Sequence, residues 1–460
     1  MPGTIENKLR TRKTVCRMDI LTPATVPAMN TTRETTHPSD LLTSAMERIY
    51  NYRMTTTSGG NLSVLDEEGS IWITPARVDK GGLKREDIVE IRPDGETLGR
   101  HKPSSEFPFH HKIYQARHDI RAIIHAHPVA LVAFSICGKR PDTRLFPKAR
   151  LICGEVGFAP YALPGSEVLG ENVAKEFARG VSCVLLENHG IVVGGASFHE
   201  AFRRFETLEF TAKTIIKASM LGEVHYLNDA ELGAERDHHA VPEEFQPLTA
   251  SACERALRRD LSDFVRRGYR QRLLISTEGS FSARVSAERF LITPRGCDRA
   301  DLHPTELVLV ENGLVERGKR ASFASRLHSA IYRRHPRVQA IINATPVNAT
   351  AFAVSHENLD TRTIPESYVF LREVEKLPLS VLSEEPDRVA SRLSPDFPVS
   401  LIENDGAMVL GNSLLDAFDR LEVLESTSEA VINCRPLGAV RAMGQGVIRE
   451  LDVAFHLPQK

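Results

Sequence analysis

A chain of 460 residues is longer than the size at which a single hydrophobic core stops growing, so the sequence predicts more than one domain. Hydrophobic residues make up 42% and charged residues 26% of the chain, which excludes a wholly disordered or fibrous protein. The formal net charge of −2 gives no electrostatic basis for binding nucleic acid.

The cysteine pattern and the distribution of apolar residues indicate the compartment. The seven cysteines are scattered, with no C-x-x-C pair, which argues against a disulfide framework and a cysteine zinc site and favours a reducing compartment. No apolar run approaches the roughly 18 residues that a membrane helix needs. We therefore expect a cytoplasmic protein whose partner is a small molecule and not a membrane.

The first segment, residues 1–37, is rich in threonine and is predicted to be a disordered leader. Its basic residues also fit a mitochondrial transit peptide, although Glu6 and Asp19 weaken that alternative.

Mixed helix and strand patterns follow along the chain. A helix is expected from Ser105 as N-cap, before a strand at 122–127. Residues 181–195 predict a buried strand, a turn and a second strand, and residues 199–222 predict an amphipathic helix. The segment 228–249 is rich in charge and proline and is predicted to be a linker.

An internal repeat decides the architecture. The segment from Leu185 recurs from Leu401 with 13 of 25 positions identical, and the segments from Trp72 and Ile113 recur at offsets of 219 and 218. Such nearly constant offsets indicate a tandem duplication. We call residues 38–227 copy one and residues 250–460 copy two.

Copy one contains a set of side chains suited to a metal ion. His125 and His127 are separated by one residue on a predicted strand, so their side chains point to the same face. Glu106 and His189 add a carboxylate and a third imidazole, a set suited to Zn²⁺ or another first-row divalent ion. Taken singly, each residue also fits an ordinary surface or core role.

The second copy favours a shared role for these four residues. At the matched positions copy two has none of them, while the flanking apolar and glycine residues persist; the replacements are Ala324, Asn343, Thr345 and Asp405. Joint replacement is what a common metal site predicts, so we expect one site in copy one and none in copy two.

The motifs of copy one resemble the class II aldolase/adducin-like family, of the L-fuculose-phosphate aldolase type. The resemblance covers about residues 38–225 and rests on GGNLSV from Gly59, WITP from Trp72, VDKGGL from Val78, PSSE from Pro103, the H-x-H-P strand and NHG from Asn188. It implies two tandem three-layer α/β/α domains with mostly antiparallel central sheets, the second one degenerate.

The resemblance also implies the site. One divalent ion per chain would be bound by Glu106, His125, His127 and His189, with Zn²⁺ expected and Mn, Fe or Co as alternatives. Glu106 would also be the proton-transfer residue. His110, four residues after Glu106, is interpreted as a packed histidine behind the ligands, with substrate binding as the alternative.

Substrate phosphate in the resembled family is bound at positions that match Asn61, Ser104 and Ser105. The family's glycine after the ITP motif is replaced by Arg77. Three interpretations of Arg77 remain open. Its guanidinium binds a phosphate or carboxylate of the substrate, its side chain blocks the phosphate pocket, or it is an ordinary surface arginine.

A second departure concerns a tyrosine that the resembled aldolase brings from a neighbouring subunit. Phe146 aligns with it, and Tyr161 or Tyr368 are candidate substitutes. Family tetramers have sites between subunits, so two tandem chains are expected to form a homo-oligomer that imitates a tetramer. Copy two would then complete one wall of the site, or would be a stabilising or regulatory domain.

Three functions remain open from the sequence. The first is a metal-dependent class II aldolase-type lyase that cleaves a C–C bond of a small sugar, sugar phosphate or 2-oxo acid through a metal-stabilised enediolate. The second is an epimerase, dehydratase or decarboxylase on the same scaffold. The third is a non-catalytic, adducin-like interaction protein.

Overall fold

The computed structural model describes residues 36–234 and 243–458. The predicted leader at 1–37 lies almost wholly outside these residues. Within the described part, none of the six cysteines forms a disulfide. No helix there has the length and apolar character needed to cross a membrane.

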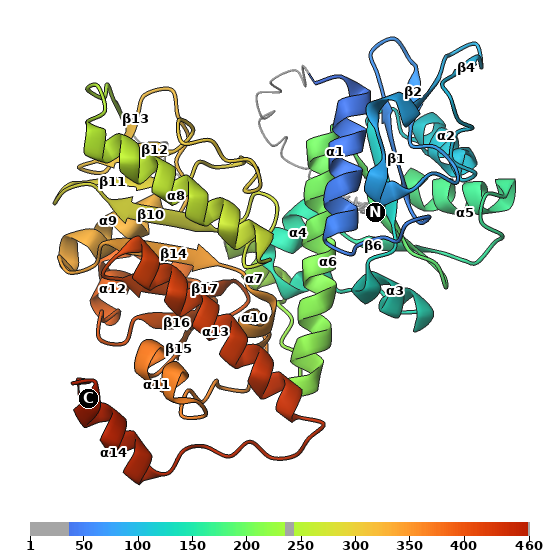
Figure 1. Cartoon of the computed structure of the whole chain (residues 1–460). Helices are drawn as coiled ribbons and strands as arrows, with labels where there is room; N and C mark the ends of the chain where they lie inside the picture. The colour runs from blue at the N-terminus through green and yellow to red at the C-terminus, as the bar shows by residue number, and fades with distance from the viewer. Residues whose placement is uncertain (1–35, 235–242, 459–460) are drawn as a thin grey trace, which may run out of the picture. The chain divides into compact units, whose positions relative to one another are not determined.

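Copy one builds a sheet of eight strands in the order β4-β3-β2-β1-β5-β8-β7-β6 (Figure 1). Its strands are β1 (Asn61–Leu65), β2 (Ile71–Ile73), β3 (Val89–Ile91), β4 (Thr97–Leu98), β5 (Ala122–Ala126), β6 (Val156–Ala159), β7 (Cys183–Leu186) and β8 (Ile191–Gly195). Its helices are α1 (Pro38–Asn51), α2 (Phe107–Ala116), α3 (Val129–Ile136), α4 (Pro147–Cys153), α5 (Glu167–Ala178) and α6 (Phe198–Leu221), and α7 (Asp229–Ala234) follows copy one. All neighbouring strands are antiparallel except β6 and β7.

Copy two repeats this arrangement in a sheet of nine strands, ordered β15-β16-β17-β14-β10-β11-β12-β13-β9. Its strands are β9 (Glu244–Phe245), β10 (Ser280–Arg284), β11 (Arg289–Ile292), β12 (Val308–Glu311), β13 (Leu314–Glu316), β14 (Ala340–Ala344), β15 (Glu375–Leu377), β16 (Val399–Ile402) and β17 (Gly406–Gly411). Its helices are α8 (Ala252–Arg270), α9 (Ser325–Arg334), α10 (Val347–Ala353), α11 (Pro365–Leu371), α12 (Pro386–Arg392), α13 (Leu414–Cys434) and α14 (Gln445–Ala454). Only the β15–β16 and β13–β9 pairs are parallel.

Alternating side chains of the strands build three layers. In β5, Ile123 packs with apolar residues of α2 and α5, whereas its neighbour Ile124 packs with those of α1 and α6. Since successive strand residues point to opposite faces, helices cover both faces of the sheet. In β14, Ile341 and Ile342 divide in the same way. The mostly antiparallel, three-layer fold expected from the sequence is confirmed.

Two local predictions are also confirmed, and one segment is more ordered than expected. Residues 181–195 form the antiparallel hairpin β7–β8, and the helix expected at 199–222 is α6, capped by Ser197. Within the expected linker, α7 is helical and β9 pairs in parallel with β13, so residues 244–245 join the sheet of copy two.

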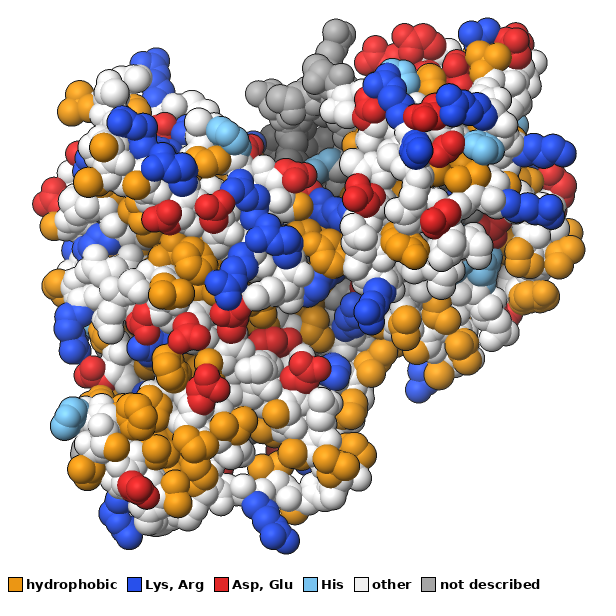
Figure 2. All heavy atoms as spheres, in the orientation of Figure 1, with side chains coloured by type: hydrophobic (Ala, Val, Ile, Leu, Met, Phe, Trp, Pro, Cys, Tyr) orange, Lys and Arg blue, Asp and Glu red, His pale blue; other side chains and the backbone are white. Residues whose placement is uncertain are grey.

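The visible face of the molecule mixes basic, acidic and hydrophobic side chains, without a large area of one charge (Figure 2). This agrees with the formal net charge of −2.

Candidate metal centre

Three neighbouring elements of the copy-one sheet bring the histidines together. His125 lies in β5, His127 follows the end of that strand, and His189 lies in the turn between β7 and β8. Because β8 pairs directly with β5, the turn lies at the end of β5. One ligating atom from each of the three residues lies within 4.8 Å of the others, and the Nε2 atoms of His125 and His127 are 3.1 Å apart.

Glu106 joins the histidines from the residue that precedes α2. Its Oε2 lies 3.1 Å from Nε2 of His125, and its Oε1 lies 3.6 Å from Nε2 of His189. Ser105 was predicted as the N-cap of this helix, and that prediction is wrong. Glu106 occupies the N-cap position, and its side chain makes no capping bond because it turns toward the histidines.

The backbone around the site restricts which residue types three positions can hold. Asn188 takes a positive φ of 55°, a conformation that asparagine tolerates better than most residues, and so lets the β7–β8 turn present His189. A Cβ on Gly190 would lie 2.5 Å from the carbonyl oxygen of Ala126, and one on Gly59 would lie 2.7 Å from Nδ1 of His127. These glycines of the NHG and GGN motifs therefore make room for His127.

One histidine is oriented by the main chain. The Nδ1 atom of His125 donates to the carbonyl oxygen of Ile191 at 3.0 Å. Its Nε2 then faces Glu106 and the other two imidazoles, and in the neutral ring this nitrogen carries the lone pair. Metal-binding histidines are commonly fixed in this way by a hydrogen bond at the second ring nitrogen.

Glu106 is held by a chain of buried hydrogen bonds. Nδ2 of Asn61 donates to Oε2 of Glu106 at 2.8 Å, and Oδ1 of Asn61 accepts from Nε2 of His110. Since a neutral imidazole that donates at Nε2 must accept at Nδ1, Ser63 donates to His110 at 2.7 Å. Oγ of Ser63 accepts from the hydroxyl of Tyr114 at 2.8 Å. The prediction of a packed His110 behind the ligands agrees with its full burial.

Electrostatics favour the protonation states that bind metal. Burial, reinforced by the charge of His125, lowers the pKa of His127 to about 3 and the pKa of His189 to about 4. Burial opposes ionisation of Glu106, but the charge and hydrogen bond of His125, then His189 and Asn61, hold the pKa of that carboxyl well below its usual range. At neutral pH His127 and His189 are therefore neutral and Glu106 is ionised, which are the states in which these groups bind a metal ion.

The residues present fit a divalent cation. Oε1 of Glu106 is buried and has no hydrogen-bond partner in the described part of the chain, although a buried carboxylate oxygen is costly to leave unpaired. Ligands about 2.0–2.1 Å from a tetrahedral zinc ion lie roughly 3.3 Å from one another. The separations of 3.1 and 3.6 Å between the ligating atoms are close to that value.

The matched site in copy two is closed by hydrogen bonds among its own residues. Oδ1 of Asn343, at the His125 position, bonds to Nε2 of His328 at 2.6 Å. Nδ1 of His328 bonds to Ser282 at 2.8 Å, and Ser282 bonds to Tyr332 at 2.8 Å. Glu278 occupies the position that matches Gly59 of copy one. This position can hold a side chain in copy two because Thr345 replaces the imidazole of His127.

Two of the predicted substrate-binding residues are buried and two are exposed. Asn61 is buried and bonded at both ends of its amide, and Oγ of the buried Ser104 accepts from the backbone N–H of Glu106 at 3.2 Å. Ser105 is exposed. Arg77 is exposed and has a positive φ of 58°, whereas the matched residue of copy two is Gly296, with a φ of 75°. The loop thus keeps a backbone that favours glycine although it carries an arginine.

The three candidate aromatic residues have separate surroundings. Phe146 is buried and stacks on Phe210 of α6, with ring centroids 5.3 Å apart. Tyr161 is 60% exposed, and the hydroxyl of Tyr368 donates to Asp452 of α14 at 2.9 Å.

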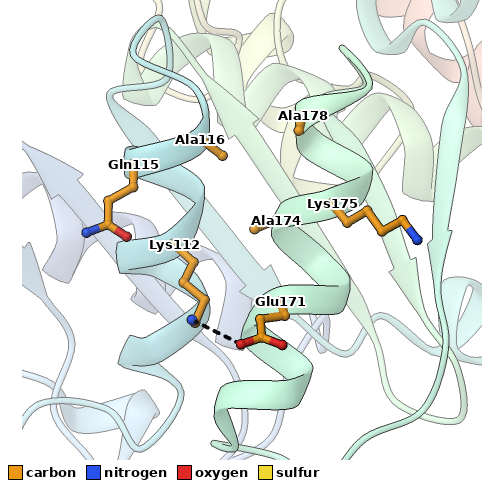
Figure 3. A pocket seen from close by; sticks show the side chains of 7 residues that line it. All are labelled: Lys112, Gln115, Ala116, Glu171, Ala174, Lys175 and Ala178. Atoms are coloured by element: carbon orange, nitrogen blue, oxygen red, sulfur yellow. Dashed lines mark ion pairs between the residues drawn. The ribbon is translucent and has the colours of Figure 1, made fainter.

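A separate shallow pocket lies between α2 and α5 (Figure 3). It is lined by alanines and by Lys112, which pairs with Glu171 at 3.7 Å. None of the predicted site residues lines it, so we assign it no part in the chemistry.

Sequence reasoning missed Ser63 and Tyr114, the far end of the hydrogen-bond chain. A signal for them was present, since copy two retains both as Ser282 and Tyr332, together with the matched histidine at His328. Their pairing depends on long-range packing between β1 and α2, which a search for metal ligands does not address.

Known proteins are similar to part of this chain. The L-fuculose phosphate aldolase of Methanocaldococcus jannaschii is 36% identical over 166 residues, which cover 36% of this chain and 88% of the relative. The 3-oxo-tetronate 4-phosphate decarboxylase of Pectobacterium atrosepticum is 38% identical over 165 residues, which cover 35% of this chain and 75% of the relative. A solved L-fuculose 1-phosphate aldolase, 33% identical, covers 43% of this chain and 92% of its own, with a TM-score of 0.40.

The family comparison covers both copies. The Class II Aldolase and Adducin N-terminal domain matches residues 40–216 and again residues 259–432, which together exceed half of the chain. This chain therefore belongs to the class II aldolase and adducin family, with two copies of the family's domain in tandem.

Proposed function

We propose that this protein is a metal-dependent lyase that cleaves a carbon–carbon bond next to a carbonyl group in a small sugar, sugar phosphate or 2-oxo acid. The observation that carries the proposal is the cluster of His125, His127 and His189 in copy one, together with the carboxylate of Glu106, which lies 3.1 Å from His125 and 3.6 Å from His189. One divalent ion per chain, with zinc as our first choice, would be bound by Glu106, His125, His127 and His189.

The proposed chemistry divides between the ion and the chain. A bound divalent ion supplies Lewis acidity, which stabilises negative charge that develops on a substrate carbonyl oxygen. Oε1 of Glu106 accepts or returns the proton at the reacting end of the substrate, since it is the carboxylate oxygen that has no hydrogen-bond partner among the described residues. Asn61 holds Oε2 and is held in turn by His110, so the carboxylate keeps one orientation during proton transfer.

Substrate recognition is proposed at the loops beside Glu106. The backbone bridges of Pro75 with Pro103, and of Ser104 with Thr74, place the Arg77 loop next to the two serines. A guanidinium on this loop would bind a phosphate or carboxylate of the substrate, with Asn61, Ser104 and Ser105 as the other candidate contacts.

Decarboxylation is the second candidate. One relative bears the name 3-oxo-tetronate 4-phosphate decarboxylase, and loss of carbon dioxide from a 3-oxo acid is also cleavage beside a carbonyl group. Two departures from the resembled aldolase favour a reaction other than aldol cleavage. Arg77 occupies a position that favours glycine, and the buried Phe146 aligns with the tyrosine of the aldolase. A non-catalytic scaffold would have no need of the buried, unpaired carboxylate oxygen.

We also propose the domain division and the assembly expected from the sequence. Residues 38–227 would form the metal-binding domain and residues 250–460 the degenerate one, joined by 228–249. The chain would form a cytoplasmic homo-oligomer in which pairs of tandem chains imitate a tetramer.

Product analysis tests the proposed reaction. Zinc-loaded protein is incubated with ketose 1-phosphates, their unphosphorylated forms and 3-oxo acids, and the products are assayed for aldehyde and for carbon dioxide. We expect one of the two products, absent from the Glu106→Gln variant. Aldehyde supports aldol cleavage and carbon dioxide supports decarboxylation. Turnover that Glu106→Gln leaves unchanged, or epimerised substrate as the sole product, would contradict a Glu106-dependent lyase.

A further inference from the structure

The candidate ligands differ in how firmly the fold places them. His125 lies within β5, which is hydrogen-bonded on both sides, to β1 and to β8, and its side chain is fully buried. His189 lies outside any strand, in the turn between β7 and β8, and its side chain is 19% exposed. A turn residue keeps one orientation only where other contacts hold the turn. The position of His189 therefore depends on what its turn contacts.

The main-chain N–H of His189 has two acceptors. One is the carbonyl oxygen of Leu186, at 3.1 Å, which belongs to the same turn. The other is Oγ of Ser135 in α3, at 3.2 Å and 54 residues earlier in the chain. The first bond closes the turn on itself, whereas the second joins the turn to a helix. Of the two, only the bond to Ser135 holds His189 relative to another element.

The helix that carries Ser135 is a firm support for this bond. Ala130 and Leu131 of α3 are buried in the core that the helix shares with α6. Glu209 of α6, which is also buried, accepts from the backbone N–H of Leu131 and so caps α3. Ser135 follows Leu131 by about one helical turn and is itself fully buried. Its hydroxyl therefore has little freedom to move away from the turn of His189.

The matched turn of copy two, between β16 and β17, has the same conformation. Asn404 keeps the positive φ of Asn188, at 51° against 55°. The N–H of Asp405, at the position of His189, bonds to the carbonyl oxygen of Ile402 at 3.2 Å. This bond corresponds to the one that His189 makes within its own turn. The turn therefore forms whether or not it carries a candidate ligand.

The bond between this turn and the neighbouring helix differs between the copies. The residue matched to Ser135 is Ala353 of α10, which has no side-chain acceptor. In copy two the N–H of Asn404 bonds instead to the main-chain carbonyl oxygen of Ala353, at 3.3 Å. Any residue at that position supplies a carbonyl oxygen, whereas the bond to the N–H of His189 needs a hydroxyl. The hydroxyl is thus found in the copy with the candidate ligands, and the turn itself does not require it.

We propose that Ser135 is a positioning residue for His189, an inference that rests on the proposed function. Ser135 is not itself a ligand and acts through the main chain of His189. Its bond holds the turn against α3, so that Nε2 of His189 stays 3.6 Å from Oε1 of Glu106. Without this bond the turn is free to shift away from the other ligands. Contacts that orient a metal ligand commonly contribute about 10–100-fold to the affinity for the metal.

The Ser135→Ala variant tests this role. Alanine is the residue that copy two has at the matched position, so we expect the fold to accept it. In a chelator competition, Ser135→Ala is expected to bind zinc about 10–100-fold more weakly than the native chain. With cobalt(II) in place of zinc, its visible absorption spectrum should differ from the native one, because the arrangement of the ligands changes. Ala353→Ser, the reverse change in copy two, is the control and should alter neither measurement.

Urea denaturation of the zinc-stripped chains separates a positioning role from a purely structural one. A Ser135→Ala chain that is less stable but has native zinc affinity and a native cobalt spectrum would make the hydroxyl purely structural and would overturn the proposal. Native stability together with native metal binding would overturn it as well, and both results would leave the proposed metal site intact. A native chain that binds no zinc would instead contradict the proposed function itself.

Discussion

The two copies of this chain share their supporting structure and differ in the residues that would bind a metal ion. Ser63, His110 and Tyr114 form the same hydrogen-bonded group in copy one as their counterparts do in copy two. Glu209 and Glu425 each cap the helix that follows the central strand, through backbone N–H groups at Leu131 and Ala349. The fold is therefore separable from the proposed metal site, since both copies have the fold and only copy one has the candidate ligands.

The largest expected effect comes from Glu106, the carboxylate that only copy one has. Glu106→Gln should lower kcat by about 10²–10⁴-fold, because it removes a general acid/base. Steady-state turnover of whichever substrate the product assay identifies measures this. Ala324→Gln, at the matched position of copy two, is the control and should match the native rate. Comparable losses in both variants would mean that the copies do not differ as we infer.

The Gly59→Ala variant tests whether zinc binding needs the space that Gly59 leaves for the ring of His127. Gly59→Ala would place a Cβ 2.7 Å from Nδ1 of His127 and displace that ring. Zinc affinity is expected to fall about 10–100-fold, the usual cost of disturbing a ligand's surroundings, as measured by chelator competition. Glu278→Ala, at the matched position, should leave zinc affinity unchanged. Native affinity in Gly59→Ala would count against His127 as a ligand.

The metal-free protein should lose stability on acidification. Burial lowers the pKa values of His110 and His127 to about 3 and that of His189 to about 4, against roughly 6.5 for unfolded histidine. The unfolded chain then binds more protons between pH 6.5 and these lower values, so stability falls as the pH falls through that window. The slope is at most about 1.4 kcal/mol per pH unit for each histidine.

Urea denaturation of zinc-stripped protein between pH 7 and pH 4.5 measures this loss. His127→Asn should flatten the profile, whereas Thr345→Asn in copy two should not. A profile independent of pH would mean that the histidines are not held neutral.

The smallest effect concerns Arg77. Arg77→Gly should raise the free energy of unfolding by about 1 kcal/mol, because a non-glycine residue with positive φ carries strain of that order. Gly296→Ala in copy two should shift it by a similar amount in the opposite direction. Urea denaturation measures both. Destabilisation by Arg77→Gly would show that the arginine side chain makes contacts that outweigh the strain.

Much of the fold could be predicted because its signals are local or repeated. The hairpin at 181–195 follows from two apolar runs around an Asn–His–Gly turn, and α6 follows from its apolar spacing. The candidate ligands emerged from comparing the copies, since four positions change while their neighbours persist.

The rest depends on packing between distant segments. The prediction of Ser105 as the N-cap of α2 was wrong because the side chain of Glu106 is drawn toward His125, which lies 19 residues further along the chain. The burial of Phe146 depends on α6 and on contact between the copies. The positive φ of Arg77 is set by its loop, whatever residue the loop carries.

Metal content tests the central claim most directly. Zinc is measured by elemental analysis on purified chain, on His127→Ala and on Thr345→Ala, the matched change in copy two. We predict one zinc ion per chain in the native protein and in Thr345→Ala, and a substantial loss in His127→Ala. Two ions per chain, or a zinc content that His127→Ala leaves unchanged, would contradict a single metal site in copy one.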